Sequence, residues 1–236
     1  MNARPVRAMR LLTPSPAARE RESAINTPSP QPSPTVAGEG ATATVALLLL
    51  VRLRSAAWGL SRLVHGERAL GKVAGLRFAR VLGSGRGGGF GLTPGLDHQG
   101  LMCFFDDEES ARAFAQEAPV VRAYRDHAHE VLLALLRATS CRGTWSGASL
   151  AVTATAQTDA PMAALTRASI RLRHAARFWQ HAPATHDAQA MDAYARSGAH
   201  LAAIQGAHQQ GWFSESMFVR FAPIEISGEW HGKRYG

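Results

Sequence analysis

The amino-acid sequence predicts an α+β protein whose folded part consists of two related halves behind a polar leader. Short apolar runs of strand length alternate with amphipathic segments of helix length from Thr44 onward, as in mixed α+β domains. The segment Asp187–Ala195 repeats the pattern of Asp107–Ala115, which indicates that the second half copies part of the first. A chain of 236 residues, 46% of them apolar, can bury one large core or two small ones.

The leader, residues 1–43, is expected to be disordered. Proline recurs through Thr27–Pro34, where it removes backbone donors and fixes φ, so this stretch suits neither helix nor sheet. We interpret the leader as an upstream extension without activity of its own. A linker or a recruitment arm is the alternative.

The first half, residues 44–150, begins with strand-like and helix-like segments in alternation. Val45–Leu53 is an apolar run of strand length, and Ala56–Lys72 carries apolar residues at nearly helical spacing. Two further strands are predicted at Leu76–Leu82 and Gly100–Phe105, with a glycine-rich loop between them.

The remainder of the first half is predicted to be helical and then extended. Asp106 and Asp107 open a helix, because acidic side chains favour the positive end of the helix dipole. Pro119 interrupts this helix, the helical pattern resumes through Tyr124, and Val131–Ser140 forms the last strand. The resulting order, β-α-β-β-α-β, is that of a ferredoxin-like unit.

The second half, residues 151–224, is predicted to be a truncated copy of this unit, followed by a C-terminal tail at 225–236. Its two middle strands are missing, since only Ala182–His186 separates its two helices. Unpaired strand edges invite association, so either a partner subunit in a homodimer completes the sheet or the product is inactive. The predicted elements are a strand at Ala164–Arg171, helices at Arg173–Ala182 and Asp187–Gln210, and a strand at Met217–Phe221.

The chain is basic, with a formal net charge of +8 and a pI near 10.6. Such a surface can meet nucleic acid, an anionic membrane or an acidic protein, while scattered arginine equally serves solubility. We expect no nucleic-acid partner, because Phe104 and Phe105 lack the neighbouring Lys or Arg of a base-stacking strand.

The cysteines and the length of the apolar runs indicate in which cellular compartment the protein is expected. Cys103 and Cys141 have no CxxC spacing and lie in apolar surroundings, so they are expected to be buried, reduced thiols of a cytoplasmic protein. The longest apolar run, Val45–Val51, is far shorter than the ~20 residues that a transmembrane helix needs.

Four short strings are not explained by helix or strand periodicity. They are Gly83–Phe90 (GSGRGGGF), Arg142–Gly147 (RGTWSG), Ala164–Arg171 (ALTRASIR) and Gly211–Glu215 (GWFSE). In this order and with their flanks they resemble the spheroidene monooxygenase family, over roughly residues 45–222. The resemblance implies a ferredoxin-dependent oxygenase of keto-carotenoid synthesis, and two fused ferredoxin-like units that resemble a dimeric α+β barrel made from one chain. The family also has a longer stretch where this chain has Ala182–His186.

The first string contains the spacing G-x-G-x-x-G. A dinucleotide site would need a helix to follow at once, and Thr93-Pro94-Gly95 argues against one. The glycines either make a flexible hairpin connection or line the mouth of a ligand pocket. The resemblance favours the pocket, with Arg86 as its charged contact.

The other strings supply further candidate binding residues. Trp145 either plugs the end of the core or forms a wall against a flat cofactor or a polyene. Arg167 and Arg171 share a strand face by the period of two, and could pair with haem propionates or with acidic ferredoxin. Exposed, salt-bridged arginines are the alternative.

The resemblance also implies haem iron. The ten histidines include no HExxH motif, and His127 and His129 cannot share a helix face, which argues against a zinc site. His200, which has small neighbours in a string that matches the family, is the expected proximal iron ligand, and His208 is a second candidate. A lone helical histidine can equally be a surface residue. No catalytic side chain is assigned.

The activity implied by the resemblance is oxidation of C2 of a spheroidene-type acyclic carotenoid to the ketone. Reduced ferredoxin would supply electrons and O2 the oxygen, and two hydroxylations would give a geminal diol that loses water. Breaking such a C–H bond requires an iron centre. Because carotenoids reside in the bilayer, peripheral membrane contact is expected. The alternatives are a truncated paralogue, inactive or only haem-binding, and a basic binding module without catalysis.

Overall fold

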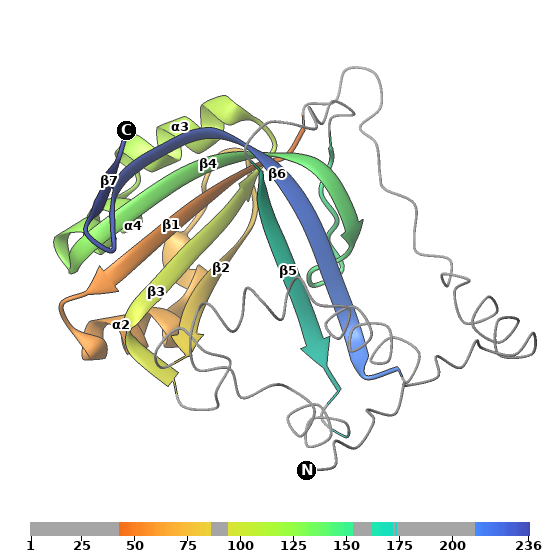
Figure 1. Ribbon diagram of the computed structural model, residues 1–236, viewed down its shortest axis with the longest axis horizontal. Helices are drawn as coiled ribbons and strands as arrows, with labels where there is room; N and C mark the ends of the chain where they lie inside the picture. The colour runs from red at the N-terminus through yellow and green to blue at the C-terminus, as the bar shows by residue number, and fades with distance from the viewer. Residues whose placement is uncertain (1–42, 86–93, 153–161, 172, 174–210) are drawn as a thin grey trace, which may run out of the picture. The chain divides into compact units, whose positions relative to one another are not determined.

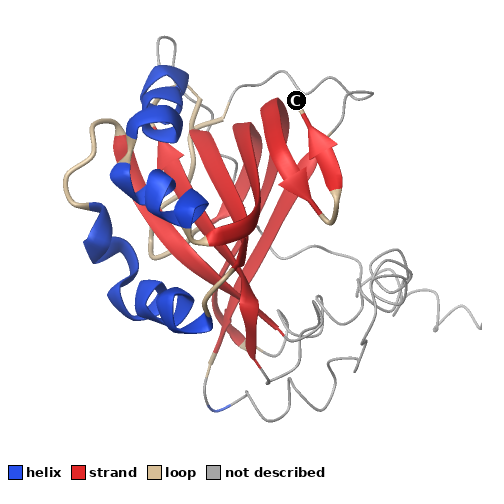
Figure 2. Ribbon diagram, turned by 90° about the vertical axis from the view of Figure 1, so that its left-hand side faces the viewer, coloured by secondary structure: helices blue, strands red, loops and turns tan. Residues whose placement is uncertain are grey.

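The computed structural model describes residues 43–85, 94–152, 162–171, 173 and 211–236. These residues form an α+β fold with a seven-stranded antiparallel sheet in the order β2-β3-β1-β4-β6-β5, and β7 pairs with β6 (Figure 1). The helices gather on one side of the curved sheet (Figure 2). The predicted leader and almost all of Arg173–Gln210 lie outside the described residues.

The central strand β1, Val45–Leu53, confirms the strand predicted from the apolar run. It is followed by α2, Ala56–His65, where the hydroxyl of Ser55 caps the first turn by accepting from Trp58 N at 3.4 Å. The predicted helix continued to Lys72. Instead Gly66, at φ 53°, ends α2, and a short 3-10 helix, Gly66–Leu70, follows.

The remaining elements of the first half match the predicted order, and several are longer than predicted. Asp107 caps α3, since its Oδ1 accepts from Ser110 N at 2.7 Å, and Pro119 opens α4 at a position where proline costs no hydrogen bond. The elements are β2 Leu76–Gly85, β3 Pro94–Phe105, α3 Glu108–Glu117, α4 Pro119–Asp126 and β4 Ala128–Gly143.

The second half contributes β5, Ala163–Ile170, and β6, Phe213–Trp230. The tail predicted at 225–236 is wrong, because β6 runs on to Trp230 and turns into β7, Lys233–Tyr235. Strand β6 also pairs with β4 of the first half, from Leu132↔Gly228 to Gly143↔Met217. The described parts of the two halves therefore share one continuous sheet.

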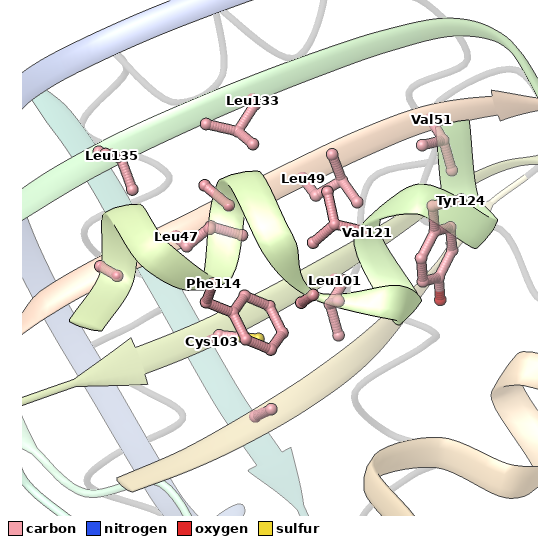
Figure 3. Packing of buried hydrophobic residues seen from close by; sticks show 14 of the residues in the cluster. Leu47, Leu49, Val51, Leu101, Cys103, Phe114, Val121, Tyr124, Leu133 and Leu135 are labelled. Carbon is pink, nitrogen blue, oxygen red and sulfur yellow. The ribbon is translucent and has the colours of Figure 1, made fainter. Parts of the chain in front are cut away.

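Apolar residues fill both faces of this sheet. On the helix-covered face, the inward side chains of β1, β3 and β4 meet those of α3 and α4 in a fully buried cluster (Figure 3). Each completely buried aliphatic side chain contributes about 1.5–3 kcal/mol. The cluster includes Leu47, Leu49, Leu101, Phe105, Phe114, Val121 and Tyr124.

The opposite face, here called the inner face, is the concave one. Arg80 on β2 and Arg167 on β5 stand at the two ends of the six-strand order, yet both guanidiniums lie within 6 Å of the Trp145 ring, at 5.7 and 5.5 Å. In a flat sheet these strands would be about 24 Å apart. The sheet therefore curls toward this side in a barrel-like manner. The inner face carries Ala46, Met102, Phe104, Leu136, Val219 and Phe221.

Both cysteines are free and buried, as predicted. Burial, with a smaller effect of Glu67, raises the pKa of the Cys103 thiol to about 12, and burial also raises the pKa of Cys141. Because the thiolate is the reactive form, we expect Ellman's reagent to label neither cysteine in the native protein and both after unfolding in guanidinium. Rapid labelling of the native protein would contradict this packing.

Candidate functional site

The site is built around a tight turn that follows β4. Ser146 and Gly147 have φ values of 53° and 78°, and Trp145 N and Ala148 N each donate to the other residue's carbonyl, at 2.8 and 3.1 Å. Two successive positive φ values are typical of the hairpin turn in which glycine is favoured at the second position. The turn presents Trp145 to the inner face.

Trp145 lies between two cations and two aromatic rings. The Cζ atoms of Arg80 and Arg167 approach its ring at 5.7 and 5.5 Å, and the rings of Phe78 and Phe104 meet it edge-on at centroid distances of 6.3 and 6.2 Å. Only 8% of Trp145 is exposed. Cations over a desolvated indole are attracted to its electron-rich face. We call Trp145 with Arg80 and Arg167 the Trp145 clamp.

Glu215, near the start of β6, holds the clamp together. Its carboxylate accepts hydrogen bonds from Gly147 N at 2.8 Å, from the Thr144 hydroxyl at 2.8 Å and from Arg167 Nη1 at 2.5 Å. The backbone N–H of Gly147, then that of Ser146, the Thr144 hydroxyl and Arg167 outweigh desolvation and lower the pKa of Glu215 to about 2. The carboxylate is therefore charged at every physiological pH.

The second cation of the clamp is paired in the same way. Arg80 Nη1 forms an ion pair with Glu67, and Arg80 Nη2 donates to the Ser146 hydroxyl at 2.7 Å. Arg167 also donates to the Ser169 hydroxyl. Each guanidinium thus forms an ion pair with a carboxylate of the same chain and also lies close to the Trp145 ring.

The structure brings together some of the predicted site residues and separates others. Trp145 and Arg167 meet in the clamp. The predicted shared face of Arg167 and Arg171 stays a prediction, because β5 ends at Ile170 and the register shift beside it places the extra residue, Ser214, on β6. Arg171 is exposed, and its Nε donates to Phe213 O at 3.2 Å. The predicted Arg86, His200 and His208 lie outside the described residues.

Arg80 of the clamp and Glu215, which binds the clamp, were not singled out from the sequence. Glu215 is the last residue of the string GWFSE. That string contributed to the family resemblance, but the carboxylate of Glu215 was not proposed as a site residue. Arg80 had only a weak signal, the alternation of Phe78, Arg80 and Leu82 that places a cation on an otherwise apolar strand face.

A histidine and a tryptophan mark the other end of the inner face. The rings of His98 on β3 and Trp230 at the end of β6 lie 5.5 Å apart, and His231 is 5.9 Å from His98. His98 Nδ1 contacts Asp97 Oδ1 at 3.1 Å, whereas its Nε2 is buried and has no hydrogen-bond partner within the described part. A buried nitrogen of this kind can accept or donate one hydrogen bond to a ligand.

The described residues leave the predicted haem site untested, because the expected iron ligand His200 lies outside them. Within the described ranges, no group of three or more His, Cys, Asp or Glu side chains could hold a metal ion. Arg167, predicted to pair with a propionate, is already neutralised by Glu215, so a propionate would have to displace that carboxylate. We therefore derive no reaction step through haem.

Fold and site together define a class: an α+β protein whose curled, barrel-like sheet offers an apolar inner face, bounded by a cation–indole cluster and a histidine–tryptophan cluster. Three of the four strings noted in the sequence meet at the first cluster, through Trp145, Arg167 and Glu215.

Comparison with known proteins identifies the family. The chain is 43% identical over 210 residues to the spheroidene monooxygenase of Rubrivivax gelatinosus, covering 76% of this chain and 81% of that protein. It is 30% identical over 213 residues to the spheroidene monooxygenase of Rhodobacter capsulatus, covering 76% and 88% of the two chains. The chain belongs to the spheroidene monooxygenase family, which confirms the predicted resemblance.

Other comparisons add little. The spheroidene monooxygenase of Cereibacter sphaeroides is 28% identical over 209 residues, covering 75% of this chain and 64% of that protein. The solved structure titled "Crystal structure study of anthrone oxidase-like protein" is 8% identical and covers 82% of this chain and 96% of its own, but its TM-score of 0.32 carries no argument. No profile of a known protein family matches the chain.

Proposed function

We propose that this protein is a monooxygenase of carotenoid synthesis that oxidises C2 of a spheroidene-type acyclic carotenoid to the ketone. The observation that carries the proposal is the 43% identity to a protein named spheroidene monooxygenase over 76% of the chain. The electron donor in this proposal is reduced ferredoxin, and the oxidant is O2.

The fold we propose for this role is a pair of fused ferredoxin-like units, the second one truncated. Support comes from the order β1-α2-β2-β3-α3-α4-β4 and from the antiparallel strand order β2-β3-β1-β4. Because the predicted second unit lacks its two middle strands, we propose that a homodimer partner covers the open edge.

In this proposal the carotenoid lies along the inner face between the two clusters. Met102, Phe104 and Leu136 are already buried, so the partly buried Leu48, Phe78 and Leu82 of the same face would contact the polyene, while the Trp145 clamp closes one end with a rigid indole. At the other end, the unpartnered Nε2 of His98 would hydrogen-bond an oxygen on the carotenoid terminus. These residues would hold and orient the substrate.

The proposed cofactor is haem, which when bound would supply the oxidising power for the C–H bond. The proposed iron ligand is His200, which lies outside the described residues, as does Arg86. The iron must therefore be sought in residues 174–210. A visible spectrum of the purified protein tests this directly, because a Soret band that disappears in His200→Ala would identify the ligand, and an iron-free protein would contradict the cofactor.

The activity is tested with purified protein, spheroidene, reduced ferredoxin, its reductase and O2. We expect a ketone product, detected by its red-shifted absorption and its mass. If the chain is inactive while a variant carrying the family's longer stretch after Ala182 is active, the inactive-paralogue alternative holds. If neither converts spheroidene, the proposed function is wrong.

A substitution on the inner face tests where the carotenoid lies. Leu48 is partly exposed on this face, so Leu48→Trp should occupy the polyene position and reduce carotenoid binding at least tenfold, with little change in stability. The matched control is Thr166→Trp, an exposed residue on the opposite face of β5. Spectral titration with spheroidene measures both variants. Equal binding by the two would place the substrate elsewhere.

No helix within the described ranges has the length and apolar character to cross a bilayer. We propose that the protein works in the cytoplasm and reaches its substrate by peripheral contact with a membrane, since a carotenoid is dissolved in lipid. Basic and apolar surface would provide that contact.

A further inference from the structure

Helix α2 presents an apolar stripe to solvent. Ala56, Leu60, Leu63 and Val64 stand at positions i, i+4, i+7 and i+8, which lie on one face of a helix. The exposed fractions of Leu60, Leu63 and Val64 are 47%, 41% and 80%. A surface helix normally turns such a face toward the core. We call these four residues the α2 stripe.

The helix cannot roll to bury this stripe, because its other side is fixed to the fold. Trp58 stacks on His127 at a centroid distance of 4.4 Å and meets Tyr124 edge-on at 5.0 Å. Gly59 is buried against Leu53, and its carbonyl accepts from Gln99 Nε2 at 2.9 Å. The exposure of the stripe is therefore imposed by the packing of the helix.

Basic residues flank the stripe in the sequence. Residues 52–72 contain five basic residues, Arg52, Arg54, Arg62, Arg68 and Lys72, and a single acidic one, Glu67. That carboxylate is used internally, in the ion pair with Arg80. The segment that carries the stripe thus has a strong excess of positive charge, and Arg68 and Lys72 are exposed.

The apolar surface continues beyond the helix. A hollow of about 310 Å³ is lined by Ala56 at the start of α2 and by Pro94–Asp97 of β3. Leu96 in this hollow is 45% exposed. The β6–β7 turn lies at the same end of the sheet, where Trp230 contacts His98 (Figure 1). This end of the sheet combines apolar, aromatic and basic side chains.

We propose that the α2 stripe and its flanking cations dock on the surface of an anionic lipid bilayer, with α2 lying in the plane of the interface. The apolar side chains would enter the boundary between headgroups and acyl chains, and the basic residues would meet lipid phosphates. Neither signal holds a protein firmly alone, whereas the two together do. This charge pattern favours a bilayer over a second copy of the chain, whose equally basic segment would repel it.

Vesicle co-sedimentation of the full chain tests the apolar part of the proposal. With vesicles of phosphatidylcholine and phosphatidylglycerol, we expect Leu63→Ser and Val64→Ser each to lower the partition coefficient about tenfold. The matched control, Met162→Ser, changes another exposed apolar residue, 60% exposed and away from α2, and should bind like the parent protein. Thermal unfolding should show all three variants folded.

The charge part is tested with a double variant, Arg68→Gln with Lys72→Gln. It should bind anionic vesicles more weakly than the parent by tenfold or more, and the parent itself should bind less as salt rises and not measurably to pure phosphatidylcholine. No binding by the parent, equal binding to both vesicles, or unchanged binding by the stripe variants would overturn the proposal. A parent dimer that Leu63→Ser dissociates would instead make the stripe a subunit interface. Spheroidene oxidation in detergent is measured separately, so the two proposals can fail independently.

Discussion

Replacing Gly143 by alanine is expected to destabilise the protein by more than about 3 kcal/mol. Gly143 ends β4 at φ 81°, a conformation that side chains disfavour. An added Cβ would also lie 2.1 Å from the carbonyl oxygen of Ser216. That oxygen cannot withdraw without cost, because it accepts the hydrogen bond from Thr144 N at 3.0 Å that brings the Trp145 turn to β6.

A second glycine provides the matched control for this prediction. Gly147 has nearly the same φ, 78°, but an added Cβ there would meet nothing within 4 Å. Gly147→Ala should therefore cost only the backbone strain, about 1–2 kcal/mol. Urea unfolding curves give the loss of unfolding free energy for each variant. The difference between the two losses is the cost of the collision at Gly143, because the strain of a positive φ is common to both. Equal losses would mean that β4 and β6 do not approach as closely as described.

Glu215→Gln is expected to lower stability at pH 7 by about 2–3 kcal/mol while preserving the shape of the side chain. The amide can still accept from Gly147 N and Thr144, but it no longer neutralises Arg167, which stays on the indole of Trp145. Glu215 is 21% exposed, so solvent screens the lost ion pair only in part.

The effect of Glu215→Gln should depend on pH with a definite sign. The folded-state pKa of Glu215, about 2, lies below its ordinary value of 4.5. The stabilisation is therefore fully present above pH 4.5 and is lost as the pH falls toward 2. Unfolding free energies of parent and variant, measured between pH 7 and pH 2, should converge over this window. A gap that stays constant down to pH 2 would exclude the charged carboxylate as its cause.

Glu225→Gln serves as the control for both measurements. Its carboxylate pairs with Arg112 at 2.5 Å on the surface, where its side chain is 44% exposed. Exposed ion pairs of this kind contribute about 0–1 kcal/mol. A loss as large as that of Glu215→Gln would show that ion pairing in general, and not the Trp145 turn, determines the effect.

The elements of the first half could be predicted because the spacing of their apolar residues is that of a strand or of an amphipathic helix. Val45–Val51 is apolar throughout, as expected of a strand covered on both faces, and Asp107 and Pro119 mark helix starts by their backbone chemistry. The extent of β6 could not be predicted. Register shifts interrupt its pairing with β4 near Pro223, and proline within a run argues against a strand.

The residues of the candidate site could be predicted where the local sequence of a single residue was unusual. Trp145 stood out as a large aromatic between glycines, and Arg167 as a cation within an apolar strand. Their partners depend on tertiary contacts, since Glu215 and Arg80 come from strands far from Trp145 in the sequence. The end of β5 at Ile170 and the bulge at Ser214 of β6 were not predictable, because a strict period of two does not reveal a bulge.

The position of β6 has a consequence for biosynthesis. Strands β4 and β5 are not hydrogen-bonded to each other, and each pairs with β6, which is translated after both. While β6 is still inside the ribosome, the backbone edge of β4 that faces away from β1 has no strand to pair with. A nascent chain in that state resembles an open sheet and is prone to intermolecular association. The emergence of β6 thus closes the sheet, and chaperone dependence should be greatest just before it.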